Sequence, residues 1–131
     1  MLNDDRKALA NDRLEQAREC LDTALLVREN GLYKAAANRA YYCIFHAMRA
    51  VLAMDGFDSK KHSGVIAAFQ QRNIKTGIFP PEFFDMIRGA FDTRGDSDYE
   101  DFFVISKDVV ARQIENAKTF LTAVEAYLKT L

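Results

Sequence analysis

The sequence has few cysteines and histidines and no long apolar run. Its 131 residues include two cysteines and two histidines, whose arrangement does not match the ligand spacing of a zinc site. No apolar run approaches the roughly 18 residues of a membrane span. The first residues, MLNDDRKALANDR, are charged and lack the apolar segment of a signal peptide. We therefore expect a cytoplasmic protein that binds neither a metal nor another cofactor and does not associate with a membrane.

Neither sign of charge is in excess. The chain has 18 basic and 19 acidic residues, which gives a net charge of −1. Such a balance exerts no general attraction on nucleic acid or on an acidic membrane, so any such binding must come from a local patch. Cys20 and Cys43 lie among apolar residues at helical positions, and we expect both to be buried free thiols.

The strongest pattern in the sequence is helical periodicity. Hydrophobic residues make up 49% of the chain, which suffices for a sizeable core, and they recur at spacings of three and four. Alternation typical of strands, internal repeats and low-complexity segments are absent from the sequence. Helices are predicted over residues 4–29, 33–54, 60–72, from Pro80 and Pro81 to 94, and from 107 to about 130. We predict one all-α domain over residues 1–131, an antiparallel up-and-down bundle of four long helices plus a short fifth.

The helix at residues 33–54 is predicted to be the axis of this bundle. From Ala40 to Met54 it is apolar almost all the way round, interrupted only by His46 and Arg49. A helix that is hydrophobic on every side must be buried among other helices. Its polar side chains therefore need partners or a function, because burial of an unpaired polar group is costly.

Three residues predict where helices end or begin. Gly31 follows the first helix, and glycine readily adopts the left-handed conformation found there. Gly95 is predicted to break the fourth helix, so that residues 94–105 form a connection. Ser106 is expected to cap the last helix, in preference to an earlier start in which Ser97 and Glu100 form a capping box.

Arg94 is the first candidate for chemistry. It continues a helical stripe of Phe and Ile residues, and Asp96, Asp98 and Tyr99 follow within five positions. One interpretation is an arginine near a helix C-terminus, favoured by the helix dipole and paired with Asp96 or Asp98. The other is a guanidinium that is held by acids and directed at a phosphate, which its planar fork suits. Tyr99 would either anchor the connection or present its hydroxyl beside Arg94.

The central helix and the segment after it hold the other candidates. His46 lies one turn after Tyr42 and two turns after Arg39. It is either a core histidine bonded to a neighbouring helix or part of a polar groove with these residues. Lys61 and His62 belong to KKHSG, a cluster of positive charge at the start of a helix, which is either a solvated turn or an anion site.

Taken together, these segments resemble small prokaryotic HEPN-domain proteins. The matching stretches are AANRAYYCIFHAMRAVL at residues 36–52, KHSGVIAAF at residues 61–69, and R-x-x-x-D-Y at residues 94–99. The resemblance implies a helical bundle, a homodimer with a shared cleft near the arginine, and a partner that is a minimal nucleotidyltransferase. In such pairs the HEPN protein is usually the toxin of a toxin–antitoxin system. Active members are metal-independent endoribonucleases in which four to six residues separate an Arg from a following His.

This sequence departs from that motif, because the positions where His is expected hold Tyr99, Glu100 and Asp101. No histidine follows Arg94 in the sequence. The chain therefore lacks, at that place, the imidazole that would act as general acid or base near neutral pH in a ribonuclease of the usual kind. His46 or His62 could replace it from another helix or from the second protomer. In some relatives a nucleotidyltransferase modifies a tyrosine near this motif, and Tyr99 is the corresponding residue here.

Three hypotheses follow. The first is the HEPN half of a two-component pair that acts on or binds RNA in a dimer cleft. In this hypothesis Arg94, Asp98 and Tyr99 lie at the reaction, and the binding residues are Arg39, Tyr42, His46, Lys61 and His62. The second is a non-catalytic module that binds a nucleotide or substrate for a partner nucleotidyltransferase. The third is a structural dimerisation bundle in which Arg94 and Asp98 form an ordinary ion pair.

Overall fold

The computed structural model describes residues 2–99 and 104–131, and the side chains of residues 3–95 and 104–131. Its elements confirm the all-α prediction of four long helices and a short one. In chain order they are α1 (Leu2–Glu29), α2 (Tyr33–Met54), α3 (His62–Phe69), a π-helical turn η1 (Gln70–Ile74), α4 (Glu82–Tyr99) and α5 (Lys107–Leu128). Within the described ranges, no helix is long and apolar enough to cross a membrane.

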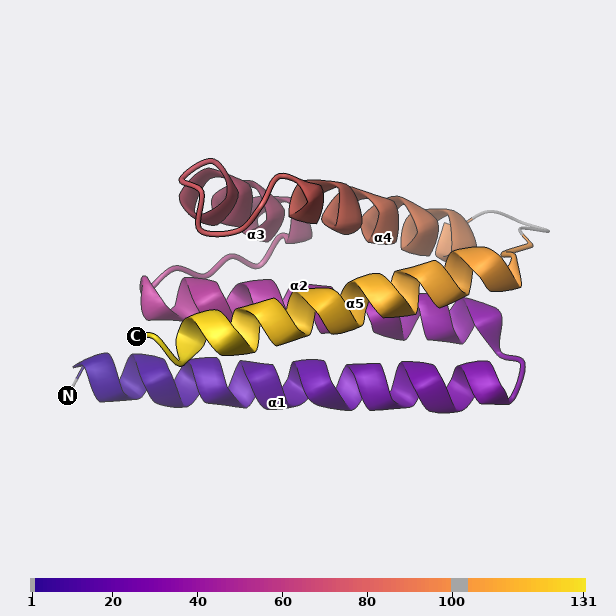
Figure 1. The fold of residues 1–131 in the computed structure, drawn as a ribbon, viewed down its shortest axis with the longest axis horizontal. Coiled ribbons are helices and arrows are strands. Elements are labelled where there is room, and N and C mark those ends of the chain that lie inside the picture. The colour runs from indigo at the N-terminus through magenta and orange to yellow at the C-terminus, as the bar shows by residue number, and fades with distance from the viewer. Residues whose placement is uncertain (1, 100–103) are drawn as a thin grey trace.

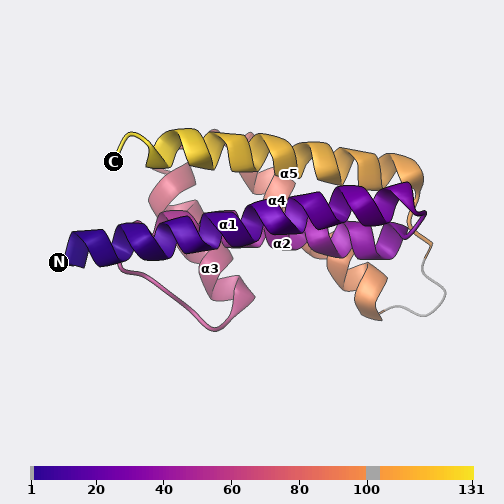
Figure 2. The ribbon, with the colours of Figure 1, turned by 90° about the horizontal axis from the view of Figure 1, so that it is seen from below.

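The long helices run up and down in chain order, and α2 lies in the middle. Figure 1 shows α1 on one side, α2 and α5 in a central layer, and α3 with α4 on the opposite side. The view from below shows α5 alongside α1 and α2, with both chain ends at the same end of the bundle (Figure 2). Helix α2 contacts α1, α3, α4 and α5, which confirms its predicted role as the axis.

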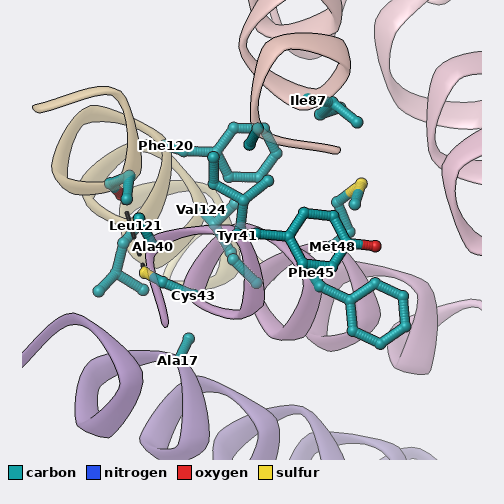
Figure 3. Packing of buried hydrophobic residues seen from close by; sticks show 14 of the residues in the cluster. Ala17, Ala40, Tyr41, Cys43, Phe45, Met48, Ile87, Phe120, Leu121 and Val124 are labelled. Carbon is teal, nitrogen blue, oxygen red and sulfur yellow. Dashed lines mark hydrogen bonds between the residues drawn. The ribbon is translucent and has the colours of Figure 1, made fainter. Parts of the chain in front are cut away.

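The core is packed around α2, which contributes buried residues along most of its length. Ala36, Ala37 and Ala40 are buried near the start of α2. Phe120, Leu121 and Val124 of α5 cover α2, and Ile87 of α4 completes the layer (Figure 3). The Phe120 ring packs at a tilt against those of Phe69 and Phe83, with ring centres 5.5 and 4.9 Å apart, and so joins α5 to α3 and α4.

Several local predictions are confirmed. Gly31 ends α1 with φ of 77°, the conformation that favours glycine. The Ser106 hydroxyl caps α5 and accepts a hydrogen bond from the Val109 N–H at 3.2 Å. Cys20 and Cys43 are buried free thiols. Burial is the main cause that raises the pKa of Cys20, and it raises the pKa of Cys43 to about 12.

The end of the fourth helix and the segment after α3 differ most from the prediction, and other helix ends shift by one or two residues. Gly95 does not break the fourth helix, because α4 continues to Tyr99. A glycine inside a helix costs about 1 kcal/mol relative to alanine, which is too little to end a helix that can continue its hydrogen bonds. The predicted loop after residue 72 is also shorter, because the chain continues from α3 through the π-helical turn η1 and buries Asn73 and Ile74.

Candidate functional site

Helix α4 directs Arg94 at two tyrosines of α2. The guanidinium carbon of Arg94 lies 5.5 Å from the ring centre of Tyr41 and 5.7 Å from that of Tyr42. Its Nη2 donates a long hydrogen bond of 3.4 Å to the Tyr42 hydroxyl. Phe91, one turn earlier in α4, packs edge-on against Tyr41 with ring centres 5.9 Å apart. The arginine therefore ends the aromatic stripe of α4, as its spacing predicted, and rests against an aromatic surface that favours a cation.

Tyr42 joins Arg94 to the other predicted residues of α2. The guanidinium of Arg39 lies 5.0 Å from the Tyr42 ring centre, and the His46 ring centre is 6.0 Å from it. Arg39 is oriented by Asn38, whose Oδ1 accepts hydrogen bonds from Nη2 at 2.7 Å and from Nε at 3.1 Å. Arg39 and His46 line a cavity of about 250 Å³ together with four residues of α1: Gln16, Glu19, Cys20 and Thr23.

His62, the first residue of α3, contacts the same two tyrosines. Its Nδ1 and the Tyr41 hydroxyl are hydrogen-bonded at 2.7 Å. The imidazole stacks on Phe45 with ring centres 4.1 Å apart and meets the Tyr42 ring edge-on at 5.7 Å. Lys61 lies outside this cluster of rings: it is the exposed N-cap residue of α3, and its backbone N–H donates to the Ser59 hydroxyl.

Positive charge is concentrated around Tyr41, Tyr42 and the two histidines, and it lowers the pKa values of both histidines. Burial lowers the pKa of His62, and the positive charges of Arg94 and Arg49 lower it further. The pKa of His46 falls to about 4, first because of burial and then because of Arg49, Arg39 and Arg13. Each imidazole is therefore neutral at pH 7. The charge of Arg94 on α4 lowers the pKa of His62, whereas the arginines that lower the pKa of His46 lie on α1 and α2.

An ion cluster fixes the connection that carries His62. Arg13 of α1 is 5% exposed. It donates to the Arg49 carbonyl at 3.0 Å and to Asp58 Oδ2 at 3.2 Å. Arg49 lies 3.6 Å from Asp58 Oδ1, and the same oxygen accepts the Ser59 N–H at 2.8 Å. Asp58 therefore ties the segment before α3 to both α1 and α2, four residues before His62.

Two predicted residues cannot be placed at this level of detail. The backbones of Asp98 and Tyr99 belong to the last turn of α4, but their side chains lie outside the described residues. Their roles beside Arg94 stay predictions. The part of the chain with described side chains contains no group of three or more His, Cys, Asp or Glu residues that could hold a metal ion.

Sequence reasoning missed the part that Tyr41 plays. Tyr41 was given no functional role from the sequence, but it is 0% exposed and its hydroxyl is hydrogen-bonded to His62. Phe45 was also not singled out, although it stacks on the same imidazole. The one available signal is their spacing of four, which places Tyr41 and Phe45 on one face of α2.

Comparison with known proteins gives consistent matches. The family model described as HEPN domain matches residues 10–127. The chain is 36% identical over 116 residues to a protein of Thermotoga maritima named "UPF0332 protein", covering 88% of each chain. It is 30% identical over 115 residues to "Putative toxin MJ0142" of Methanocaldococcus jannaschii, covering 88% of this chain and 78% of that one.

A solved structure described as that of ST0689, an archaeal HEPN homologue, superposes with a TM-score of 0.65. The match covers 91% of this chain and 97% of the other at 19% identity, so it bears on the fold alone. It agrees with the helical bundle described above.

Proposed function

This chain belongs to the HEPN domain family, and from that premise we propose that it is the toxin-like half of a two-component pair that binds RNA through Arg94. The partner would be a minimal nucleotidyltransferase, and a homodimer would place two such sites along one cleft. Relatives from Methanocaldococcus jannaschii that are named "Putative toxin" support the toxin-like role.

The observation that carries the proposal is the placement of Arg94 against Tyr41 and Tyr42, with His62 beside them. A guanidinium binds phosphate oxygens through two parallel N–H groups. Aromatic side chains and arginines together hold single-stranded nucleic acid, because bases stack on accessible rings while cations contact the backbone. Tyr41 is fully buried and supports Arg94, so the half-buried Tyr42 is the ring that would meet a base. Arg39 adds a second cation at the Tyr42 ring, 5.0 Å from its centre. The near-zero net charge of the chain makes this local concentration the natural place for an RNA backbone.

The alternative function is a non-catalytic module that presents a nucleotide or substrate to the partner nucleotidyltransferase. The residues after Arg94 favour it, since Tyr99, Glu100 and Asp101 stand where the ribonuclease motif has His. Both functions use the same cation and the same rings. They differ in ligand, since the first requires an RNA strand and the second a mononucleotide such as ATP.

The test is a binding titration by fluorescence anisotropy with a labelled single-stranded RNA whose 2′-hydroxyls are methylated, so that no cleavage occurs. Arg94→Ala should weaken binding about tenfold, which corresponds to the loss of one charge-assisted contact. The matched control is Arg88→Ala, which removes a cation from an exposed position of the same helix and should leave affinity within twofold of the wild type. Equal affinity of Arg94→Ala and wild type would contradict the proposal, as would failure of the wild type to bind.

Two further measurements separate the functions. Calorimetry with ATP reports the mononucleotide site, and Arg94-dependent binding of ATP without binding of RNA would favour the alternative. Incubation with unmodified RNA at high protein concentration in EDTA reports cleavage. Capture of the nucleotidyltransferase partner by wild type and by Arg94→Ala tests the pair itself, independently of the ligand.

A further inference from the structure

The hydrogen bond between Tyr41 and His62 determines more than the position of the imidazole. Neutral histidine carries one ring proton, on either Nδ1 or Nε2, and the partner of one nitrogen determines which form is present. Tyr41 holds Nδ1 at 2.7 Å. The direction of this one bond therefore decides whether Nε2 is a hydrogen-bond donor or a proton acceptor.

The surroundings of Tyr41 indicate the direction. Its side chain is 0% exposed and packed against Tyr42, Phe45 and Phe91. Burial raises the pKa of Tyr41 well above its usual value, so the hydroxyl keeps its proton. A buried hydroxyl proton requires an acceptor, and among the residues with described side chains the only hydrogen-bond partner of this hydroxyl is His62 Nδ1. Were Nδ1 protonated, two protons would compete for one bond and the hydroxyl proton would have no acceptor.

The other ring nitrogen remains available. No described residue forms a hydrogen bond with Nε2 of His62, and this atom of the half-buried side chain is not fully buried. Stacking on Phe45 at 4.1 Å and the edge-on contact with Tyr42 at 5.7 Å hold the plane of the ring. These contacts fix the imidazole beside the tyrosines on which Arg94 rests.

We propose that Tyr41 donates to Nδ1 and fixes His62 as the Nε2–H tautomer, so that His62 is a neutral hydrogen-bond donor to the RNA phosphate bound by Arg94. This inference rests on the proposed function. Tyr41 is a positioning residue, and His62 is a binding residue. A neutral donor can lie close to the Arg94 charge, whereas an imidazolium there would be repelled. The same tautomer has no lone pair on Nε2 and cannot take a proton from a ribose hydroxyl, so His62 does not replace the missing base.

The experiment combines a tautomer measurement with conservative variants. Two-bond ¹H–¹⁵N correlation spectra distinguish the protonated from the unprotonated ring nitrogen, and His62→Gln identifies the signals by their loss. The wild type should show His62 protonated at Nε2, and Tyr41→Phe should populate the Nδ1–H form. Far-UV circular dichroism confirms that each variant is folded.

The binding arm uses the 2′-O-methylated RNA. His62→Ala should weaken binding about fivefold, the effect of one neutral hydrogen bond. His62→Gln, whose amide N–H lies near the position of Nε2, should stay within twofold of the wild type, and His62→Asn, whose amide lies near Nδ1, should resemble His62→Ala. Rescue by Gln and not by Asn is a result that a purely structural role would not produce.

The inference fails while the proposed function stands if His62 of the wild type is protonated at Nδ1, or if RNA binding depends on Arg94 but not on His62. It is also overturned if Gln fails to rescue in a folded variant. Absence of RNA binding by the wild type overturns the proposed function and the inference with it, whatever the tautomer.

Discussion

Asp58 is the acid on which the geometry near His62 depends, and its removal gives a prediction of defined size. Its carboxylate accepts a hydrogen bond from Arg13 Nη2 at 3.2 Å and one from the Ser59 N–H at 2.8 Å. Arg49 lies 3.6 Å away. The Arg13 side chain is only 6% exposed, whereas that of Asp58 is 55% exposed. Removal of the acid therefore leaves the buried Arg13 cation without its carboxylate partner and next to the partly buried Arg49 cation.

The magnitude follows from these contacts. A hydrogen bond to a charged group contributes about 1.5–3 kcal/mol, and the exposure of Asp58 places this one at the low end because water screens the pair. Asp58→Ala should lower the free energy of unfolding by about 2 kcal/mol, or lower Tm by about 7 °C for a domain of this size. Asp58→Asn keeps an oxygen acceptor and should lose about half as much.

Urea denaturation followed by circular dichroism measures the difference, with Asp55→Ala as a control because its ion pair with Arg72 is longer, at 3.8 Å, and exposed on both sides. In the double variant Arg13→Met with Asp58→Ala, part of the stability should return, since no unpaired charge stays buried. A loss below about 0.5 kcal/mol for Asp58→Ala would refute the reasoning, and so would a double variant that is less stable than the sum of the single variants predicts.

Other predictions concern the core and the helix ends. His46 has a pKa of about 4 in the folded protein, whereas an ordinary histidine has a pKa of about 6.5. Between these pH values the unfolded chain binds a proton at His46 that the folded chain does not bind. The free energy of unfolding should therefore fall by up to about 3 kcal/mol as the pH drops from 6.5 to 4. His46→Gln should flatten this dependence in urea titrations at pH 7 and 4.5, and an unchanged slope would count against a neutral buried imidazole. Burial raises the pKa values of Cys20 and Cys43, so both thiols should react with Ellman's reagent at least roughly tenfold more slowly in the folded protein than in urea; equal rates would show that they are accessible. Ser106→Ala should cost about 1 kcal/mol through loss of the cap, and an unchanged urea midpoint would argue against that contact.

The fold was predictable where local signals agree with burial. The helix at residues 33–54 has the bounds predicted for it, because a segment apolar on every side must be buried and Gly31 provides a strong stop before it. Ser106 was likewise identified by its place between a polar connection and an apolar stripe. The predictions that were wrong concern boundaries that depend on small differences in free energy. Gly95 has only a modest intrinsic preference against helix, and the π-helical turn η1 has no sequence signature that was recognised.

The helix faces that carry the candidate residues were predictable, but the arrangement of these residues in space was not. Arg94 continues the α4 stripe as its spacing predicted, and the guanidinium groups of Arg94 and Arg39 both lie near the Tyr42 ring. The bond between Tyr41 and His62 spans 21 positions. It depends on how residues 55–61 bring α3 back against α2, which in turn depends on Asp58, Arg13 and Arg49. Periodicity describes the faces of single helices, and it does not determine how a connection returns one helix to another.

The central claim is that Arg94 contacts an RNA phosphate, and the salt dependence of binding tests it most directly. Each phosphate contact by a cation contributes about 0.7 to the slope of log affinity against log salt concentration for a single strand, because bound counterions are released. The measurement is that slope for wild type, Arg94→Ala and Arg88→Ala with the methylated RNA. If Arg94 contacts a phosphate, the slope should be smaller by about 0.7 for Arg94→Ala and unchanged for Arg88→Ala. The same slope for all three proteins would contradict it.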